Sequence, residues 1–418
     1  MRIRKKPYRA RQLKSLQESD LLESVRDKHV VVATDVAKVD MVSSIELSDG
    51  ALLSLVRWKN PSELRDFVSL VVAVGRAATE VECVQEPSGT YGDPLRAALQ
   101  RHGLPVYRVS PKHVHDLQEV YDSTPSSHDP KAARVIARVH RDGLSVLWED
   151  RNLDLAAQER RHNWFLSEKT RLRSLLEARL ARHWPEVGAL LDLHSTTLLR
   201  LLDEYGSPAA VARAQAGARS LMRSTGRGPL APEKIEAVLA SAADSVGVPA
   251  TEAEAGELKL LAHEFLRVNA ELKAEKQQLL TVGATEPSIV RMQPVAGKVT
   301  AVVLFALLGD PANYDSAGAY IKAAGLNLRE HSSGKKKGQL AISKRGPGTA
   351  RLLLYFAAMR LVKEEPLFKE WHERKKARSG PRQGKKSIIA LCRKLMAALW
   401  HVGRGATFEP SRLIAQPA

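Results

Sequence analysis

His29-Val30-Val31-Val32-Ala33-Thr34-Asp35 is a run of apolar and β-branched residues that ends in a carboxylate. Branched side chains pack well on a pleated surface, and a short apolar run of this kind is typical of a buried strand. We therefore predict a buried strand over residues 29–35, with Asp35 at its rim.

The segments after this strand alternate between strand patterns and helix patterns. Ser48-Asp49-Gly50 carries an Asp-Gly pair, which favours a tight turn between the two arms of a hairpin. The alternation predicts an α/β domain over residues 29–145, with a largely parallel sheet beside an antiparallel hairpin. The predicted elements are hairpin arms at 41–47 and 51–58, helices at 61–74 and 95–102, and strands at 81–86 and 104–109. A basic N-terminal arm, residues 1–28, precedes this domain, and we expect it to be mobile.

Carboxylates stand at the ends of two predicted strands. Asp35 ends the first, and Glu86 ends the strand at 81–86. Such a pair suits a hard cation, because Mg²⁺ takes oxygen ligands and keeps some of its waters. Asp129 is a third candidate ligand. It stands directly before Pro130, the N-cap and first-position pairing that opens many helices, so it either caps a helix or binds metal.

Length and charge restrict the class of protein. The chain has 418 residues, which predicts two or three domains. It holds 64 Lys and Arg against 47 Asp and Glu, a formal net charge of +17. Such an excess indicates a polyanionic partner. Nucleic acid is favoured over a membrane because the chain has no long apolar segment.

The ends of the chain and its cysteines indicate a compartment. Met1-Arg2-Ile3-Arg4-Lys5-Lys6 is basic, but no apolar segment of a secretion signal follows it. Cys83 and Cys392 lie far apart and form no CxxC pattern. Their spacing favours a reducing compartment and argues against a structural zinc site. We expect a cytoplasmic protein.

Residues 146–285 have the pattern of a charged, helical middle region. Apolar residues recur at coiled-coil spacing, with Glu275 in the one missing slot. They are Leu258, Leu261, Phe265, Val268, Leu272 and Leu279. The stripe is compatible with a coiled coil, within one chain or between subunits, and equally with an amphipathic helix packed on its own domain.

Residues 286–418 predict a mainly α-helical C-terminal domain. Its exception is a Gly-punctuated segment, predicted to be a loop, in which Ser333 stands among cations. Those cations are Lys335, Lys336, Lys337, Lys344 and Arg345. Such clusters are often solvated turns. A serine in a cationic field is also a candidate nucleophile towards phosphorus, because the cations stabilise the charge of the transition state.

Several segments, in order along the chain, together resemble the DEDD-type transposases of the insertion-sequence one-ten family. No single motif is sufficient, but the set is specific. The matching segments are Asp35-Val36-Ala37-Lys38, Glu86-Pro87-Ser88-Gly89-Thr90-Tyr91, Asp129-Pro130-Lys131, Gly325-Leu326, Ser333-Gly334 and Ile342-Ser343-Lys344-Arg345-Gly346.

The resemblance implies a fold and a function. Members are RuvC-like recombinases, so it implies an RNase H-like N-terminal domain, a helical and coiled-coil spacer, and a C-terminal transposase domain. Asp35, Glu86 and Asp129 would hold Mg²⁺ or Mn²⁺. Ser333 would attack DNA covalently, with Ser332 as the neighbour left open. The implied partners are donor and target DNA, a bridge RNA that guides the enzyme, and further copies of the chain in a homodimer or homotetramer.

Two positions depart from the family pattern. The fourth acid of the family stands three residues after the third, and here that position is Ala132. Either three acids suffice, or Asp122 or Glu119 substitutes, or this copy is impaired. In Pro294-Val295-Ala296-Gly297-Lys298 the family usually has two glycines, and only Gly297 remains. Gly297 is our candidate for a helix-hairpin-helix-like turn that meets phosphate through backbone N–H groups, and the missing second glycine predicts that this turn is less open.

Two rival functions remain open at this stage. One is a metal-dependent junction nuclease in which water attacks, which needs the acids but not Ser333. The other is a non-catalytic nucleic-acid-binding relative of a transposase, which the missing acid at Ala132 favours. His331, two residues before Ser333, is a candidate base for the serine, although loop histidines are often merely exposed.

Overall fold

The computed structural model describes residues 9–122, 128–148, 152–225, 230–333, 336–379 and 384–414. Within these ranges the side chains of residues 119, 122, 331–333, 336, 337, 339 and 379 are not described. The chain forms two compact units, Met1–Asp150 and Arg151–Ala418. Within the described ranges, none of the helices combines the length and the apolar character needed to span a bilayer.

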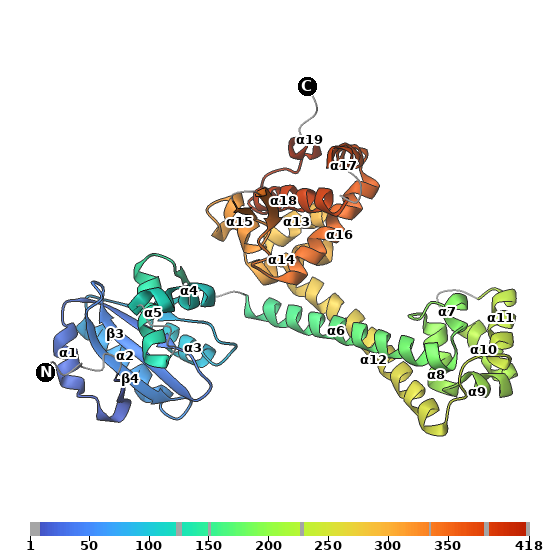
Figure 1. Ribbon diagram of the computed structural model, residues 1–418, viewed down its shortest axis with the longest axis horizontal. Coiled ribbons are helices and arrows are strands. Elements are labelled where there is room, and N and C mark those ends of the chain that lie inside the picture. Colours follow the sequence, from blue (N-terminus) through green and yellow to red (C-terminus); the bar gives the residue numbers. More distant parts are fainter. Residues whose placement is uncertain are drawn as a thin grey trace. The chain divides into compact units, whose positions relative to one another are not determined.

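A mixed sheet of seven strands forms the centre of the first unit (Figure 1). In spatial order the strands are β1 (Arg11–Gln12), β4 (Leu52–Lys59), β3 (Asp40–Leu47), β2 (His29–Asp35), β5 (Glu80–Gln85), β6 (Val106–Arg108) and β7 (Val146–Leu147). β3 runs antiparallel to β2 and β4, whereas β2, β5 and β6 are parallel neighbours. The sheet confirms the predicted hairpin beside parallel strands, but it is mixed rather than largely parallel, because β7 also runs antiparallel to β6. This topology fits an RNase H-like domain.

The central strand β2 is buried on both faces. Val30 and Val32 belong to one apolar core, and Val31 and Ala33 belong to the other. Successive strand residues point to opposite faces, so an unbroken apolar run covers both sides. The helices on the first face are α1 (Glu18–Val25), α2 (Leu64–Ala77) and α3 (Asp93–Arg101), and those on the second are α4 (Pro111–Asp122) and α5 (Asp129–Arg141).

The N-terminal segment is part of this domain from residue 9. β1 pairs with β4, and α1 buries Leu21 and Val25 in the core it shares with α2. The expectation of a mobile arm is therefore wrong for the described residues 9–28. Its basic composition concealed two apolar side chains one helical turn apart.

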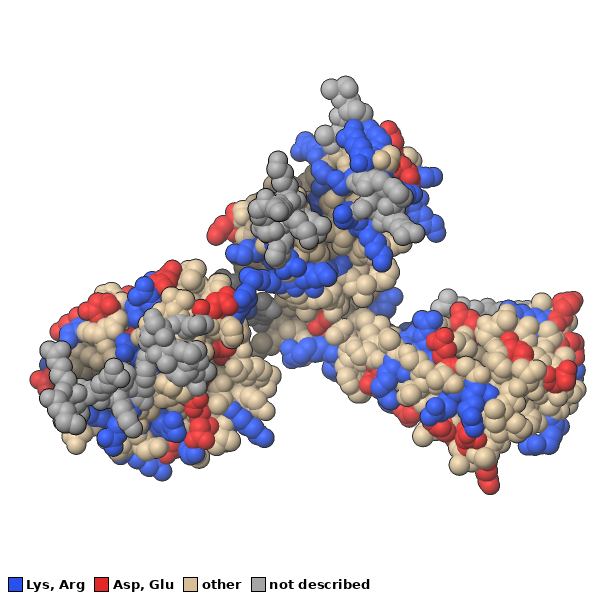
Figure 2. All heavy atoms as spheres, in the orientation of Figure 1, with Lys and Arg blue, Asp and Glu red and all other residues tan. Residues whose placement is uncertain are grey.

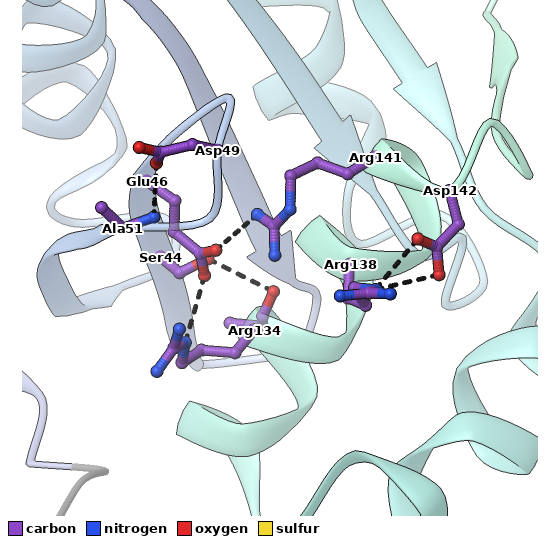
Figure 3. A network of polar contacts seen from close by, with 9 residues as sticks. Ser44, Glu46, Asp49, Ala51, Arg134, Arg138, Arg141 and Asp142 are labelled. Atoms are coloured by element: carbon purple, nitrogen blue, oxygen red, sulfur yellow. Dashed lines mark hydrogen bonds and ion pairs between the residues drawn. The ribbon is translucent and has the colours of Figure 1, made fainter.

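Helix α5 is fixed to the sheet by a buried polar network (Figure 3). The Glu46 side chain on β3 is fully buried and forms ion pairs with Arg134, at 3.3 Å, and with Arg141, at 2.6 Å. Ser44 donates a hydrogen bond to the Ala133 carbonyl. A buried carboxylate needs such partners, because an unpaired charge in a low-dielectric interior is costly.

Two long helices pair along the second unit (Figure 1). α6 (Leu153–His183) packs along α12 (Glu252–Gly283), so the coiled-coil stripe is buried within one chain. Leu258, Phe265 and Val268 are buried against α6 and a group of short helices. The short helices are α7 (Val187–Leu190), α8 (Thr196–Tyr205), α9 (Pro208–Arg213), α10 (Gln215–Ser224) and α11 (Pro232–Ala243).

The C-terminal part of the second unit is mainly helical, as predicted. Its helices share a core that also receives Leu155 from the start of α6 and Leu279 from the end of α12. They are α13 (Pro287–Ala296), α14 (Lys298–Leu308), α15 (Ala317–Ala323), α16 (Gly348–Glu364), α17 (Pro366–Ser379), α18 (Gly384–Gly403) and α19 (Pro410–Leu413).

The segment around Ser333 is a β-hairpin, not the loop that the sequence suggested. β8 (Leu328–Ser333) pairs antiparallel with β9 (Lys336–Ile342). The serines and lysines masked a strand pattern, because polar residues are normal on a two-stranded ribbon, and most of the side chains described on this one are exposed.

Candidate active site

Asp35 and Glu86 leave the sheet at the same edge. Asp35 is the last residue of β2, and Glu86 follows Gln85 at the end of β5. The strands are parallel neighbours, with Thr34 paired to Gln85. Parallel strands end at a common edge, so the two carboxylates emerge beside each other, as the sequence predicted.

Asp129 occupies the first position of α5, which packs against β2, β3 and β5. The N-cap is His128, whose ring nitrogen accepts a hydrogen bond from the Lys131 backbone N–H at 3.3 Å. The proposed alternative, in which Asp129 caps the helix, is therefore wrong. Asp129 is exposed, and its carboxylate is not used as a cap.

The three acids share one electrostatic environment. Burial, the charge of Asp129 and the charge of Glu86 together raise the pKa of Asp35 to about 7. Burial also raises the pKa of Glu86. Both effects disfavour the ionised carboxylate, and a nearby positive charge would reverse them. The fold thus brings together three residues that lie as much as 94 positions apart in the sequence.

These carboxylates fit a divalent cation in their chemistry, because Mg²⁺ and Mn²⁺ prefer oxygen ligands. Burial and, after it, the charges of Asp129 and Glu86 raise the pKa of Asp35, and a bound cation would oppose these effects by favouring the ionised carboxylate. No three His, Cys, Asp or Glu side chains are already arranged to hold an ion in the part of the chain that the structure describes. Asp35, Glu86 and Asp129 therefore lie in one region of the domain, but their side chains are not arranged as a complete set of metal ligands.

The position of the fourth acid contributes no ligand. Ala132 lies on α5, one turn after Asp129, and is only 6% exposed. It has no side-chain oxygen. The candidate substitutes, Asp122 and Glu119, belong to α4, but their side chains lie outside the described residues.

Ser333 belongs to the second unit, whereas the three acids belong to the first. It is the last residue of β8 and pairs with Lys336, the first residue of β9. Gly334 and Lys335 lie outside the described residues, as do the side chains of Ser332, Ser333, Lys336 and Lys337. The backbone thus places the candidate serine and two of the predicted lysines at one end of the hairpin.

Lys344 and Arg345 lie at the opposite end of the same hairpin. Leu328 pairs with Ile342 there, about 17 Å along the strand from Ser333 at 3.4 Å per residue. Both cations are exposed. The Arg345 backbone packs closely against Gly325, which precedes the hairpin. A Cβ on Gly325 would lie 2.8 Å from it. The fold therefore separates these cations from the lysines beside Ser333.

Gly297 is the whole connection between α13 and α14. Its φ angle is +91°, a conformation that side chains rarely adopt. Arg360 from α16 lies against this turn and donates a hydrogen bond to the Val295 carbonyl at 2.8 Å. Two helices are thus joined by the single remaining glycine, and phosphate contact through this turn stays a prediction.

Sequence reasoning missed two cations at this turn. Lys276 from α12 and Arg360 from α16 line the same cleft as Gly297 and Lys298. Nothing in their sequence context distinguishes them from other surface cations. The available signal was regional: residues 286–418 hold 24 Lys and Arg against 9 Asp and Glu. Figure 2 shows basic side chains spread over the C-terminal helices, with few acids among them.

Comparisons with known proteins agree with the resemblance. A DEDD transposase profile of the IS110 type matches residues 32–185. A second profile, described as transposase IS116/IS110/IS902 family, matches residues 288–373. The two matches include the three acids of the first unit and the hairpin of the second.

Relatives come from insertion elements of Streptomyces. An uncharacterized 44.8 kDa protein of insertion element IS116 from Streptomyces clavuligerus is 24% identical over 365 residues, which cover 84% of this chain and 90% of that protein. An uncharacterized 43.6 kDa protein of insertion element IS110 from Streptomyces coelicolor is 25% identical over 260 residues, covering 60% of this chain and 62% of that protein. Among solved structures, T. thermophilus RuvC in complex with a Holliday junction substrate matches with 13% identity and a TM-score of 0.23, over 29% of this chain and 99% of that one.

Two profiles in succession and relatives that span most of the chain identify one kind of protein: the chain belongs to the IS110 family of DEDD transposases and is a DNA transposase.

Proposed function

We propose that this transposase cuts and rejoins DNA with an active site in two parts. Asp35, Glu86 and Asp129 would hold a divalent metal, and Ser333 would form a covalent bond with the cut strand. The observation that supports the first part is geometric: Asp35 ends β2, Glu86 follows the parallel neighbour β5, and Asp129 begins α5, which packs against both strands. The second part rests on the Ser-Gly match at residues 333 and 334.

The chemistry assigns one role to each group. When bound, Mg²⁺ or Mn²⁺ would polarise the scissile phosphodiester and stabilise negative charge on its oxygens. The Ser333 hydroxyl loses its proton to a base, for which His331 is our candidate, and its oxygen bonds to phosphorus. The bond from phosphorus to the departing DNA oxygen breaks, and that oxygen takes up a proton. The phosphoserine keeps the bond energy until a second DNA hydroxyl displaces the serine.

Trapping the covalent adduct tests this mechanism. Labelled donor DNA, Mg²⁺ and purified protein should give a protein–DNA band that survives denaturation. Ser333→Ala should abolish that band, and the matched neighbour Ser332→Ala should retain it. Asp35→Asn should also abolish it. If a protein carrying both Ser333→Ala and Ser332→Ala still cuts DNA, the nucleophile is water and the junction-nuclease alternative holds. If Ser332→Ala alone loses the band, the neighbouring serine is the nucleophile.

We further propose that a bridge RNA selects the DNA targets and that the active assembly contains two or four copies. Support comes from the family membership and from the excess of cations on residues 286–418. Recombination joins two duplexes, which favours more than one active site. Sequence choice by base pairing would need only shape and backbone contacts from the protein. RNA extracted from the purified protein should match the flanking noncoding segment of its element, and ribonuclease treatment should abolish cutting.

A further inference from the structure

We propose that a cleft between α12, the α13–α14 turn and α16 binds single-stranded nucleic acid, with Phe356 stacking on a base and Lys276, Lys298 and Arg360 contacting phosphates. The inference rests on the proposed use of nucleic acid by this protein and specifies where an unpaired strand is held. The site lies wholly within the second unit.

The cleft is open and positively charged. Its volume is about 390 Å³, and it is lined by Lys276 and Leu280 from α12, by residues 296–300, and by Phe356, Ala357 and Arg360 from α16. Three of these lining residues are cations, and none of them is Asp or Glu. Glu364 lies nearby on α16, 61% exposed, with an oxygen 3.7 Å from Arg360 Nε. The balance of charge at the opening favours an anionic ligand.

Phe356 is unusual among the aromatic side chains of this region. It is 56% exposed, whereas Phe305, Tyr320 and Phe368 in the same helical core are at most 8% exposed. An aromatic face at the opening of a cationic cleft is the arrangement by which proteins hold unpaired bases, because any base can stack on it. A paired duplex offers phosphates but keeps its base faces stacked internally.

The cations are held where phosphates could follow the cleft. Arg360 is fixed against the turn by its hydrogen bond to the Val295 carbonyl, and its side chain is still 37% exposed. Lys298 begins α14 directly after Gly297 and is exposed. Nucleic acid backbones carry one phosphate per nucleotide, so several cations that line the same cleft as an aromatic ring match a short single strand.

A second copy of the chain is a less suitable occupant. Leu352 and Met359 extend the exposed apolar stripe of α16, at 54% and 46% exposure, and such stripes can dock helices. Residues 286–418 hold 24 cations against 9 acids, however, so docking this basic surface on itself would oppose like charges.

Binding of fluorescent oligonucleotides by the full-length protein tests the proposal. Phe356→Ala should weaken binding of a 12-nucleotide single strand by about tenfold, since stacking on one aromatic ring contributes about that factor. Phe356→Leu should be equally weak, and Phe356→Trp should restore binding. The matched control is Leu352→Ala, which removes an equally exposed side chain from the same helix outside the cleft and should bind normally. Binding of a 12-base-pair duplex should change less than twofold in every variant.

Three results would overturn the inference. One is a Phe356→Ala protein that binds the single strand as tightly as wild type. Another is a Phe356→Ala protein that loses as much affinity for the duplex as for the single strand, which would mean that the cleft binds DNA regardless of strandedness. The third is a Phe356→Ala protein whose sedimentation shows lost self-association with oligonucleotide binding intact, which would assign the stripe to a second copy. The Ser333→Ala protein should bind single strands normally, so failure of the covalent mechanism would leave this test unaffected.

Discussion

Three causes disfavour the ionised form of Asp35: its burial, the charge of Asp129 and the charge of Glu86. Its pKa is about 7 in the folded protein and 3.8 as the ordinary value. Between these pH values the folded chain holds a proton that the unfolded chain has lost. Folding stability therefore falls as pH rises from about 4 to about 7, and the loss is complete above pH 7.

Replacing Asp35 should consequently stabilise the metal-free protein while it abolishes cutting. We expect Asp35→Asn to raise the melting temperature by about 4 °C at pH 8 and by much less at pH 4, because it removes the repelled charge. Added Mg²⁺ should raise the melting temperature of wild type but not of the variant. Asp66→Asn, at an exposed carboxylate on α2, is the control and should change nothing. A variant less stable than wild type at pH 8 would contradict the expectation.

Ala132 offers a second test at this scale. Ala132→Asp places a carboxylate at the family's fourth position, in a site that is now 6% exposed. We expect the metal-free variant to lose about 2 kcal/mol of stability, the cost of burying an unpaired polar group. We also expect half-maximal cutting at a lower Mn²⁺ concentration, because a ligand is added. Ala133→Asp, at the adjacent buried position, should lose stability without any gain in metal affinity. Titration of cutting against Mn²⁺ measures the metal dependence of both variants, and urea unfolding measures their stability.

The places of the three acids in the fold could be predicted, because two of them stand at strand ends and the third at the start of a helix; their role as metal ligands stays a prediction. The role of His128 could not, since histidine is not a preferred N-cap and only the hydrogen bond to Lys131 reveals it. Ala132 was visible in the sequence as a departure, but the burial of its side chain was not.

At the scale of elements, the attachment of α5 decides where Asp129 lies. Glu46→Gln should leave Arg134 and Arg141 without a buried counter-charge, so we expect a loss of about 3 kcal/mol in the free energy of unfolding. The matched control is Asp142→Asn on the same helix, whose ion pair with Arg138 is exposed and should contribute less than about 0.5 kcal/mol. Urea unfolding measures both variants. If both variants lost the same free energy of unfolding, the buried ion pairs would contribute no more to stability than the exposed one.

The pairing of α6 with α12 contains a comparable but weaker polar contact. Glu275 fills the slot where the apolar stripe is interrupted; it is 3% exposed and pairs with Arg161. Its second carboxylate oxygen is buried without a hydrogen-bond partner among the described residues. The Arg161 side chain is 56% exposed and can turn towards water if its partner is removed.

Glu275→Leu should therefore stabilise the helix pair. We expect the melting temperature to rise by about 3 °C, because replacing a buried ion pair by an apolar side chain is often favourable. Glu264→Leu, at an exposed ion pair on the same helix, should leave it within about 1 °C. A fall for Glu275→Leu would mean that the salt bridge outweighs the cost of burying it.

The helices and strands differed in how well they could be predicted from the sequence. The hairpin at Ser48-Asp49-Gly50 has alternating arms and a specific turn, and it was predicted within one or two residues. The β8–β9 hairpin was not, because its strands carry lysine and serine instead of an alternating apolar pattern. The Glu46 network escaped prediction because its partners lie 88 and 95 residues away in the sequence. Only the packing of α5 on the sheet brings them together.

At the scale of the whole molecule, each apolar core formed by the described residues belongs to a single unit. Two cores consist only of residues before Asp150, and two consist only of residues after Arg151. We expect residues 1–150 and 151–418, expressed separately, each to unfold in one cooperative transition at nearly its temperature in the intact chain. Calorimetry measures this. A fragment that binds hydrophobic dye and shows no transition would reveal a stabilising contact between the units.

The α6–α12 pair joins two cores at its opposite ends, with Leu155 and Leu279 in one and Phe165 and Leu258 in the other. α12 has 32 residues, so it extends about 48 Å at 1.5 Å per residue. A tilt of about 5° at its middle would swing the far end by about 2 Å, simply from that length. If the α13–α14 cleft binds nucleic acid as proposed, a small rotation of the α6–α12 pair would move the α7–α11 helices at its other end by that distance.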